Sequence, residues 1–448
     1  MRRLRTCLTV SVAAITVVLA LSGQQAFASS VRHVVILYQE NHSFDDVLGR
    51  VCGGKLLCDG ARSGRLPDGT TIPLQTATDI VPEVNHDGLS QAMATDGGRM
   101  DGFAKLKGCT AADDYRCYSQ YAPSQIPNLS RLAKGFTVSD RTFEMHLIPS
   151  WGAHLELVAQ QLDGFLAATH PLPTGPNPGS GWGCDSQKDT RWAAAPGDTP
   201  ILVPSCVPDP SLDPTAFPFG GAYRQTPVPH VPTIMDELDA SGLSWKIYGG
   251  APGSVGYGWA ICPTFADCLY TAEDRNAVKG NRVLTDAANG ALPAFSVVIP
   301  EPTTSQHNNY SMRQGDNWIG SVVSAIEQGP DWRSTAIFIT YDDCGCFYDH
   351  VKPPAGLGIR VPMVIVSPWA KRRFVDSRVA SFSSMLAFTE HTFGLRPLSN
   401  RDANAYDYSN AFNFQQRPLS PVPMTHTRLS GKSRAAVRDN PVNPSGDT

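Results

Sequence analysis

Short apolar runs alternate with amphipathic segments along most of this chain, and polar residues follow several of the runs directly. Two runs, HVVILY (His33 to Tyr38) and AIFI (Ala336 to Ile339), have the composition of buried strands. Further segments read as strands at 243–250, 294–302 and 361–368, and as helices at 126–136, 231–242, 317–329 and 379–394. Strands and helices that alternate in this way predict an α/β fold with a doubly wound sheet.

Three segments depart from this alternation. Residues 144–162 (EMHLIPSWGAHLELVAQQL) predict a short strand that turns at Pro149-Ser150 into an amphipathic helix. Residues 163–230 are crowded with Pro, Gly and Trp, and a loop-rich segment of that length predicts an insertion that shapes a substrate mouth. Residues 415–448 are rich in Pro, Ser and Arg without an apolar period, which predicts a loosely ordered tail.

The first residues have the organisation of a secretory signal peptide. Three arginines among the first five residues precede an apolar run from Leu8 to about Leu21, and an Ala-x-Ala sequence ends at Ala28. The alternative is an uncleaved anchor, for which the apolar run is short. We therefore expect residues 1–28 to be cleaved after Ala28 and the protein to be secreted.

Charge excludes one class of partner. The 448 residues include 37 Lys and Arg against 41 Asp and Glu, a net charge of −4. A nucleic-acid binder needs a concentrated basic surface, and no stretch of the sequence predicts one. Nucleic acid is therefore not an expected partner.

The cysteines occur as neighbouring couples. Without Cys7 in the predicted signal peptide, ten remain, and an even number in an exported chain favours disulfides. A zinc cluster is the alternative, but the spacing does not suit it. We expect sequential pairing, least firmly for the last couple because its ring is very small: Cys52/Cys58, Cys109/Cys117, Cys184/Cys206, Cys262/Cys268 and Cys344/Cys346.

Oxygen-bearing side chains follow three predicted elements. Glu40 and Asn41 follow the first strand, Asp342 and Asp343 follow the run at 336–339, and Ser150 opens the helix after Pro149. In open α/β sheets ligands bind at the carboxyl ends of strands. Carboxylate and amide oxygens favour Ca²⁺, Mg²⁺ or Mn²⁺ over a thiolate-type zinc site. The alternative is a solvated turn of acids without a ligand.

A serine and three histidines complete the candidate chemistry. Ser150 is either an ordinary helix N-cap or a nucleophile activated by a metal at a helix start that also suits phosphate. His86, His307 and His350 could bind phosphoryl oxygens or protonate a leaving group, although each alone could equally be structural. We expect the other histidines near these segments to be mainly structural: His42, His146, His154 (one helical turn after Ser150) and His391.

Four blocks, in order, resemble the signatures of the bacterial phosphoesterase family, which contains phosphatidylcholine-type phospholipases C and exported acid phosphatases. The blocks are HVVILYQENHSFDDVLG, NHDGLSQAMATDGGRMDGF, SQHNNYSMRQGD and TYDDCGCFYDHVKPP, within about 33–398. The resemblance implies an alkaline-phosphatase-like α/β core with helices on both faces of the sheet. It assigns a phosphoesterase catalytic domain to residues 29–414.

The resemblance also implies roles for the residues at the matching positions. Glu40, Asn41, Asp342 and Asp343 look like ligands of one or more divalent metal ions (Ca, Mg, Mn or Zn), and Ser150 stands at the position of the nucleophile. The three histidines, His86, His307 and His350, match residues that line the phosphate site.

The sequence departs from the family pattern in three places. Asp343 stands where Glu is common, Cys344 and Cys346 stand where glycines are usual, and the Pro-Asn or Asn-His element after the nucleophile is missing. The long carboxyl-terminal extension of the larger phospholipases is also lacking.

These features predict a secreted, metal-dependent phosphoric-ester hydrolase that acts like a phospholipase C through a phosphoserine intermediate. One alternative is an acid phosphatase for monoesters, and another is a non-catalytic exported binding protein on the same scaffold. Trp151, Trp182 and Trp192 favour a choline-bearing substrate, unless they only pack the insertion. The expected partner is a phosphoester, with a phospholipid as one candidate, and at most peripheral membrane contact is expected.

Overall fold

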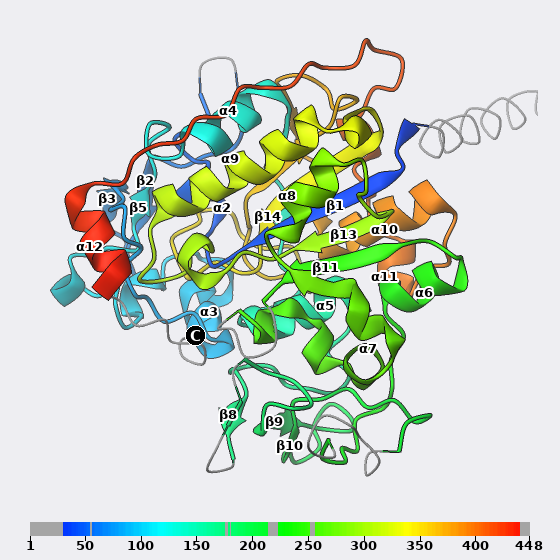
Figure 1. Ribbon diagram of the computed structural model, residues 1–448. Coiled ribbons are helices and arrows are strands. Elements are labelled where there is room, and N and C mark those ends of the chain that lie inside the picture. Colours follow the sequence, from blue (N-terminus) through cyan, green and yellow to red (C-terminus); the bar gives the residue numbers. More distant parts are fainter. Residues whose placement is uncertain are drawn as a thin grey trace, which may run out of the picture.

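A computed structural model describes residues 30–53, 56–174, 178–179, 181–213, 223–250 and 256–439 (Figure 1). The predicted signal peptide lies outside these residues. Most of the molecule is built on an eight-stranded sheet with the strand order β12-β11-β13-β1-β14-β15-β6-β16. In that order the strands are Ala277–Lys279, Trp245–Gly249, Phe295–Val298, His33–Gln39, Thr335–Tyr341, Met363–Val366, Thr137–Ser139 and Phe374–Asp376.

The two strongest apolar runs of the sequence lie side by side at the centre of this sheet. β1 is parallel both to β13 and to β14, with Val34 opposite Phe295 and Ala336. All seven residues of β14 are buried, which explains why its sequence is a continuous apolar run without alternation. Because β1 and β14 are parallel, their carboxyl ends meet at one edge of the sheet.

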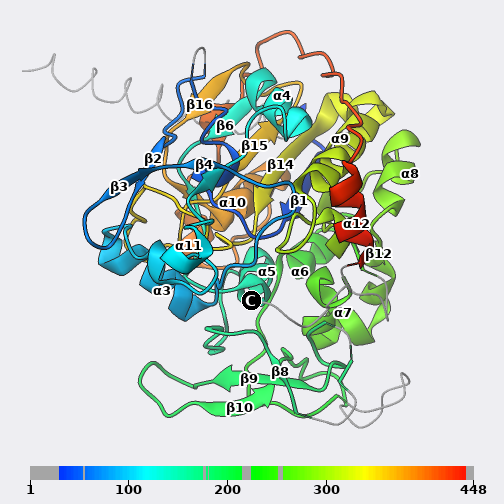
Figure 2. The same cartoon turned by 90° about the vertical axis from the view of Figure 1, so that its left-hand side faces the viewer.

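Helices cover both faces of the sheet, as predicted (Figures 1 and 2). On one face lie α4 (Pro127–Gly135), α8 (Arg282–Ala288) and α9 (Met312–Gln328), and on the other lie α5 (Ser150–Ala159), α6 (Ile234–Ala240) and α10 (Phe382–Phe393). Aromatic rings of Phe382 and Phe388 pack on Tyr38 and Phe338 with centroids 5.5 and 5.0 Å apart, and so fix α10 on β1 and β14. The predicted α/β fold is confirmed.

Short elements complete the described chain. The remaining helices are α2 (Phe44–Val47), α3 (Gly88–Thr95), α7 (Ala266–Tyr270), α11 (Asn400–Ala403) and α12 (Gly431–Asp439). The remaining strands are β2 (Ser63–Arg65), β3 (Thr71–Pro73), β4 (Gln75–Thr76), β5 (Ser119–Gln120), β7 (Thr142–Phe143), β8 (Leu172–Pro173), β9 (Lys188–Trp192), β10 (Ile201–Pro204) and β17 (Ala380–Ser381).

One predicted strand is wrong. Residues 144–149, which lead into α5, form a buried irregular connection that follows β7. Their backbone bonds to a neighbouring loop instead of a sheet: Glu144 donates to the carbonyl of Ile359 at 3.1 Å and accepts from Gly358 at 2.9 Å. The apolar side chains that suggested a strand serve a buried loop.

The insertion at 163–230 carries the small sheet β10-β9-β8, set apart from the central sheet beneath α5 and α7 in Figures 1 and 2. Its predicted disulfide, Cys184–Cys206, is present. So are the other four sequential pairs, Cys52–Cys58, Cys109–Cys117, Cys262–Cys268 and Cys344–Cys346. The predicted pairing of the cysteines is therefore confirmed.

The segment after residue 414 lies across α4 and α9 and then forms α12. Two asparagine side chains bind the backbone of this segment, each donating one hydrogen bond and accepting one, as a neighbouring strand would. Asn128 exchanges hydrogen bonds of 2.9 and 2.7 Å with the backbone of Thr425, and Asn317 exchanges two of 2.8 Å with Thr427. Besides these polar contacts, Leu419, Val422 and Met424 pack against the core, but at positions without a regular apolar period.

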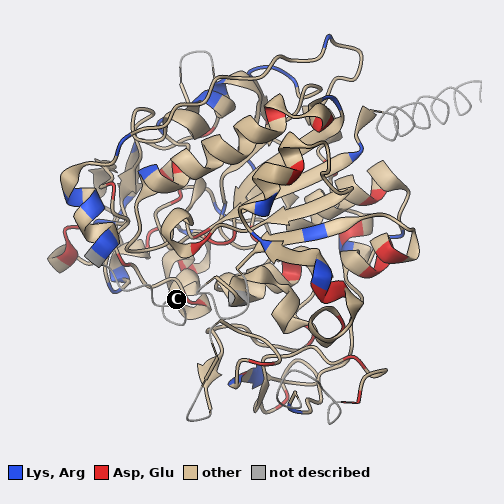
Figure 3. Cartoon of the chain, viewed as in Figure 1, with Lys and Arg blue, Asp and Glu red and all other residues tan. Residues whose placement is uncertain are grey.

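Figure 3 shows basic residues gathered on α12, while both charges mix over the rest of the described chain. None of the helices in the described ranges combines the length and apolar character that crossing a membrane requires.

Candidate active site

The predicted ligands and the predicted nucleophile meet at one edge of the central sheet. Glu40 and Asn41 directly follow β1, Asp342 and Asp343 directly follow β14, and Ser150 is the first residue of α5. The backbone N–H of Asn41 donates to Oδ1 of Asp342 at 2.8 Å and so joins the two strand ends. All five side chains are buried.

The hydroxyl of Ser150 points into this group of side chains. Its Oγ accepts a hydrogen bond from Nδ2 of Asn41 at 3.1 Å and donates to Oδ2 of Asp343 at 3.4 Å. Nδ2 of Asn41 also donates to Asp343 at 3.0 Å. Pro149, not Ser150, occupies the N-cap position of α5, so the hydroxyl does not act as an ordinary cap.

Several oxygens of this site lack hydrogen-bond partners within the described part of the chain. They are both carboxylate oxygens of Glu40, Oδ1 of Asn41 and Oδ2 of Asp342. Burial raises the pKa of Glu40 to about 8 and raises that of Asp342 well above its usual range, in the latter case with help from the charge of Asp343. Buried carboxylates without partners are costly unless a cation compensates them, so this donor set fits a divalent metal ion.

His154 joins the acids, although we had expected it to be structural. It lies one turn after Ser150 on α5, and its Nε2 is 3.3 Å from Oε1 of Glu40 and 4.0 Å from Oδ2 of Asp342. Glu40, His154 and Asp342 form a group that could hold a metal ion. The signal in the sequence was the spacing of four residues from Ser150, which places both side chains on one face of a helix.

His86 and His307 lie together beside α3. Their rings are 5.8 Å apart, and the ring of His307 stacks on Trp259 with centroids 5.8 Å apart. Nδ1 of His86 bonds to the carbonyl of Val84 at 2.8 Å, whereas its buried Nε2 has no partner among the residues that the structure describes. One nitrogen of His86 is thus available for a ligand.

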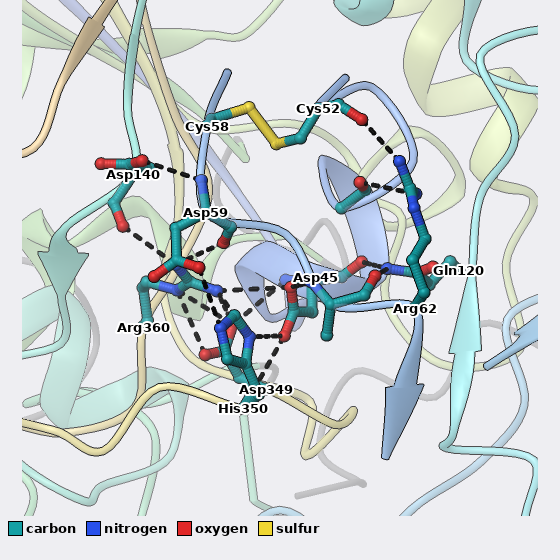
Figure 4. Close-up of a disulfide and its surroundings, with 12 residues drawn as sticks. Asp45, Cys52, Cys58, Asp59, Arg62, Gln120, Asp140, Asp349, His350 and Arg360 are labelled. Carbon is teal, nitrogen blue, oxygen red and sulfur yellow. Dashed lines mark hydrogen bonds and ion pairs between the residues drawn. A yellow bond between two sulfur atoms is a disulfide. The ribbon is translucent and has the colours of Figure 1, made fainter. Parts of the chain in front are cut away.

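His350 belongs to a different cluster, shown in Figure 4. Its Nδ1 is 2.6 Å from Oδ2 of Asp45 and its Nε2 is 3.1 Å from Oδ1 of Asp59, so both ring nitrogens are already paired. Burial alone would lower the pKa of His350, but the hydrogen bond and charge of Asp45 raise it to about 9. We had expected His350 to line a phosphate site, but the structure pairs its ring with carboxylates instead.

A buried arginine organises this second cluster. Arg360 bonds to both oxygens of Asp349 at 3.1 Å and lies 3.3 Å from Oδ1 of Asp45. Its guanidinium also stacks on the ring of Phe44, 4.2 Å from the centroid. Asp45, Asp349 and His350 could geometrically hold a metal ion, but Arg360 already supplies the positive charge. The cluster therefore ties α2, which follows Asn41, to the loop after β14.

The loop after β14 is pressed against the first strand end. Gly345, between the paired Cys344 and Cys346, has a positive φ of 60°, and a side chain there would collide with the carbonyl of Asn41, 2.0 Å from the Cβ position. Only glycine combines that backbone conformation with so close an approach. Asn41 itself has a φ of 61°.

Sequence reasoning missed two further residues near the site. His170, in the insertion, is buried and stacks on Trp182 with ring centroids 4.6 Å apart. Burial lowers its pKa well below the usual range, and the charges of His86 and His307 lower it further, which places His170 near them. Nothing in the loop-rich sequence around His170 indicated this position.

The second missed residue is Glu144, in the irregular connection before α5. It is buried, and neither carboxylate oxygen has a hydrogen-bond partner in the described ranges. Burial, then the charges of Asp343 and Asp342, raise its pKa well above the usual range. Its neighbours in sequence suggested a strand, so the side chain was not considered.

The predicted aromatic residues of the insertion mainly pack. The indole N–H of Trp192 donates to the carbonyl of Asp163 at 2.8 Å, and Trp151 is buried against Phe165. Trp182 is buried beside His170, and its indole N–H has no partner among the described residues. The choline-bearing substrate that these residues suggested stays a prediction.

Known proteins resemble this chain over most of its length. Phospholipase C A from Mycobacterium tuberculosis is 23% identical over 90% of this chain and 81% of that protein. Non-hemolytic phospholipase C from Burkholderia pseudomallei is 29% identical, and non-specific phospholipase C6 from Arabidopsis thaliana 30%. These two alignments cover 41% and 31% of this chain and only 36% and 34%, about a third, of the relatives.

Similar solved structures include a member of the alkaline phosphatase superfamily from Vibrio parahaemolyticus (TM-score 0.35, 13% identity, 83% of this chain and 72% of that one). Another is a phosphonate monoester hydrolase from Silicibacter pomeroyi (TM-score 0.30, 12% identity, 60% and 69%). The model of the Phosphoesterase family matches residues 31–396, which include every candidate site residue described above. The chain therefore belongs to the Phosphoesterase family, as its four sequence blocks predicted.

Proposed function

We propose that this protein is a metal-dependent phosphoric-ester hydrolase that acts like a phospholipase C. The observation that carries the proposal is the environment of Ser150. Its hydroxyl stands at the start of α5, bonded to Asn41 and Asp343, beside buried acid oxygens that have no other partner among the described residues. A nucleophile at a helix start next to a cation site is the equipment for phosphoryl transfer.

Glu40, Asn41, Asp342 and Asp343 would hold the metal ion. The identity of the ion is left open by these oxygens alone, which suit Ca²⁺, Mg²⁺, Mn²⁺ or Zn²⁺. When bound, such an ion lowers the pKa of a nearby hydroxyl and neutralises charge on the phosphoryl oxygens.

In the proposed reaction, residues of this chain form the phosphoserine intermediate and move the protons. Oγ of Ser150 attacks phosphorus while its proton passes to Asp343, and the bond from phosphorus to the alcohol breaks. His86, with its unpartnered nitrogen, donates a proton to the departing alcohol and then accepts one from a water molecule. The oxygen of that water bonds to phosphorus as the bond from phosphorus to Ser150 breaks, and Asp343 returns its proton to Oγ of Ser150, which restores both groups. His307 orients the phosphoryl group beside His86.

Exposed apolar side chains favour a lipid diester as the substrate. Leu89 and Met93 on α3 are 70% and 46% exposed, and Leu166, Leu172 and Leu202 of the insertion are 42%, 65% and 66% exposed. Single exposed leucines are ordinary, but neighbouring ones around a site indicate an interaction surface. We call these five residues the apolar rim.

Backbone contacts join the two parts of the apolar rim. Gly88, next to Leu89, donates to the carbonyl of Ala168 at 2.9 Å, and Leu166 donates to Arg191 at 3.0 Å. Arg191 pairs across the small sheet with Leu202. The rim flanks His86, which precedes α3, and His170, which lies between Leu166 and Leu172. A phospholipid surface resting on the rim would present its head groups to the site.

We also propose that the protein is secreted. Five disulfides within the described residues are typical of an oxidising compartment. This agrees with the signal peptide predicted from residues 1–28.

The deciding assay compares p-nitrophenylphosphorylcholine, a diester, with p-nitrophenyl phosphate, a monoester, before and after removal of metal by a chelator. We expect faster hydrolysis of the diester, its loss with chelator and its return with one divalent ion. A strong preference for the monoester would establish the acid phosphatase alternative. No hydrolysis of either ester with any divalent ion would favour a binding protein on this scaffold.

A further inference from the structure

One nitrogen atom lies among the oxygens of the candidate metal site. Nε2 of His154 is 3.3 Å from Oε1 of Glu40 and 4.0 Å from Oδ2 of Asp342, and His154 is only 2% exposed. None of these three atoms has a hydrogen-bond partner within the described ranges. Three buried polar atoms from three elements therefore converge on one point.

The other ring nitrogen of His154 is fixed by the backbone. Nδ1 lies 2.9 Å from the carbonyl oxygen of Trp259, which can only accept a hydrogen bond, so Nδ1 carries a proton. In the neutral ring Nε2 then has a lone pair, and this nitrogen is the one that lies near Glu40 and Asp342. A histidine whose far nitrogen donates to a backbone carbonyl is the usual arrangement of a metal ligand.

Tyr38 holds the plane of this ring. Its ring centroid lies 4.8 Å from that of His154, and its hydroxyl donates to the carbonyl of Ala153 at 3.2 Å. Tyr38 is on β1, two residues before Glu40, so the strand that supplies an acid also fixes the histidine. The orientation of the imidazole is therefore built into the fold.

An ion pair between His154 and Glu40 is the competing interpretation. An imidazolium facing Glu40 would donate a hydrogen bond to it, yet neither atom makes one with any residue that the structure describes. A metal ion between the two atoms explains both the short approach and the missing bond.

We propose that His154 is a nitrogen ligand of the metal ion, and that the site therefore selects a first-row transition ion of the Zn²⁺, Fe²⁺ or Mn²⁺ class over Ca²⁺ and Mg²⁺. The proposal rests on the metal site of the proposed function. Imidazole suits transition ions, whereas Ca²⁺ and Mg²⁺ prefer sites built of oxygen alone. The sequence departs from its family in this helix, where the Pro-Asn element after the nucleophile is replaced by Trp151-Gly152-Ala153-His154.

Pulsed electron paramagnetic resonance on the Mn²⁺-loaded full-length protein tests the ligand directly. We expect modulation from one ¹⁴N nucleus of a coordinated imidazole, and we expect His154→Asn to remove it. A Mn²⁺ spectrum without ¹⁴N modulation would overturn the proposal, and this measurement needs only the wild-type protein. Modulation that persists in His154→Asn would also overturn it, since another nitrogen would then be the ligand.

Titration calorimetry on the chelator-treated protein tests the selectivity. We expect His154→Asn to weaken Zn²⁺ binding by about 100-fold and to change Ca²⁺ binding little, because the asparagine still offers an oxygen. His391→Asn is the control, because His391 lies on α10 and not on α5, where it pairs with Asp407 at 2.9 Å. Equal loss of both ions would count against the inference. Absence of any metal binding by the wild type would instead refute the proposed function.

Discussion

At the scale of single residues, two features support the proposed chemistry. The hydroxyl of Ser150 is hydrogen-bonded on both sides, and one ring nitrogen of His86 has no partner among the described residues. Asn41 donates to the hydroxyl of Ser150 and Asp343 accepts from it, so the oxygen is aimed before a substrate arrives. His86 uses one ring nitrogen to hold its own position on the carbonyl of Val84. In His86, the atom that holds the ring in place is thus separate from the atom that we propose to react.

Ser150→Ala is expected to reduce kcat by about 10⁴-fold or more, because no other hydroxyl can form the intermediate. The melting temperature should change little, since Pro149 and not Ser150 caps α5. Ser367→Ala is a matched control: Ser367 is buried and bonds to Thr335 at 2.9 Å, at the opposite end of β14 from Asp342. Substantial hydrolysis by Ser150→Ala would refute the phosphoserine mechanism.

His86→Gln should affect esters in proportion to the basicity of their leaving alcohol. A phosphodiester that releases an alkyl alcohol needs a proton, and its hydrolysis should fall by about 10²- to 10⁴-fold. The corresponding p-nitrophenyl ester releases a stable anion and should lose far less. The measurement is kcat for both esters on both proteins. An equal loss for both would make His86 a residue that binds the phosphoryl group and not a proton donor.

At the scale of elements, the loop after β14 is held from two sides. The disulfide Cys344–Cys346 and Gly345 press it on Asn41, while Arg360 and His350 tie its far end to Asp45. These contacts keep Asp342 and Asp343 at the end of their strand. The second cluster thus holds in place the loop that carries Asp342 and Asp343.

Stability should depend on pH through His350. Its pKa is about 9 in the folded protein against an ordinary value of 6.5, so its protonation stabilises the fold fully below about pH 6.5, and this contribution is lost as the pH rises through 9. His350→Gln should lower the free energy of unfolding by about 2 kcal/mol at pH 6 and by much less above pH 9.5. Chemical denaturation of both proteins across this range measures the difference. A constant difference at every pH would contradict the assignment.

How far the sequence predicted this arrangement depends on the kind of element. The apolar pattern and its length predicted three elements correctly: β1, β14 and α4. The candidate site residues were found because they lie at the ends of such elements: Glu40 and Asp342 follow strands, and Ser150 begins a helix. The partners of His350 were not predictable, since Asp45 and Asp59 lie about 300 residues earlier in the sequence. Only the folded structure brings side chains so far apart in sequence into contact. Buried irregular connections, such as residues 144–149, imitate strands in sequence because both are apolar.

At the scale of the whole molecule, the insertion adjoins α3, and we propose that the substrate enters there. The central sheet positions the candidate site, whereas the small sheet β10-β9-β8 extends beyond it and carries two of the five residues of the apolar rim, Leu172 and Leu202. The segment after residue 414 lies across α4 and α9. It is therefore on the face of the central sheet opposite to α5, α6 and α10. We thus assign catalysis to the edge of the central sheet and substrate entry to the insertion and α3. The segment after residue 414 lies apart from both.

The double variant Leu172→Asp, Leu202→Asp should bind phosphatidylcholine vesicles at least about 10-fold more weakly than the wild type, because each buried leucine contributes about 2 kcal/mol. Vesicle flotation measures binding. Leu284→Asp and Val379→Asp are controls, since these residues are 37% and 51% exposed on other elements. All variants should hydrolyse the soluble diester p-nitrophenylphosphorylcholine at the same rate. Equal vesicle binding by all of them would exclude the rim as a lipid-binding surface.

The backbone of Asn41 imposes a second requirement on a residue already needed for its side chain. With a φ of 61° the position favours Gly, Asn or Asp. Glycine lacks the amide that aims Ser150, and aspartate has no N–H to donate and adds charge to three neighbouring acids. Of the twenty amino acids, only asparagine meets both demands. In a library that samples every residue at position 41 and is selected for hydrolysis, we expect asparagine alone to survive.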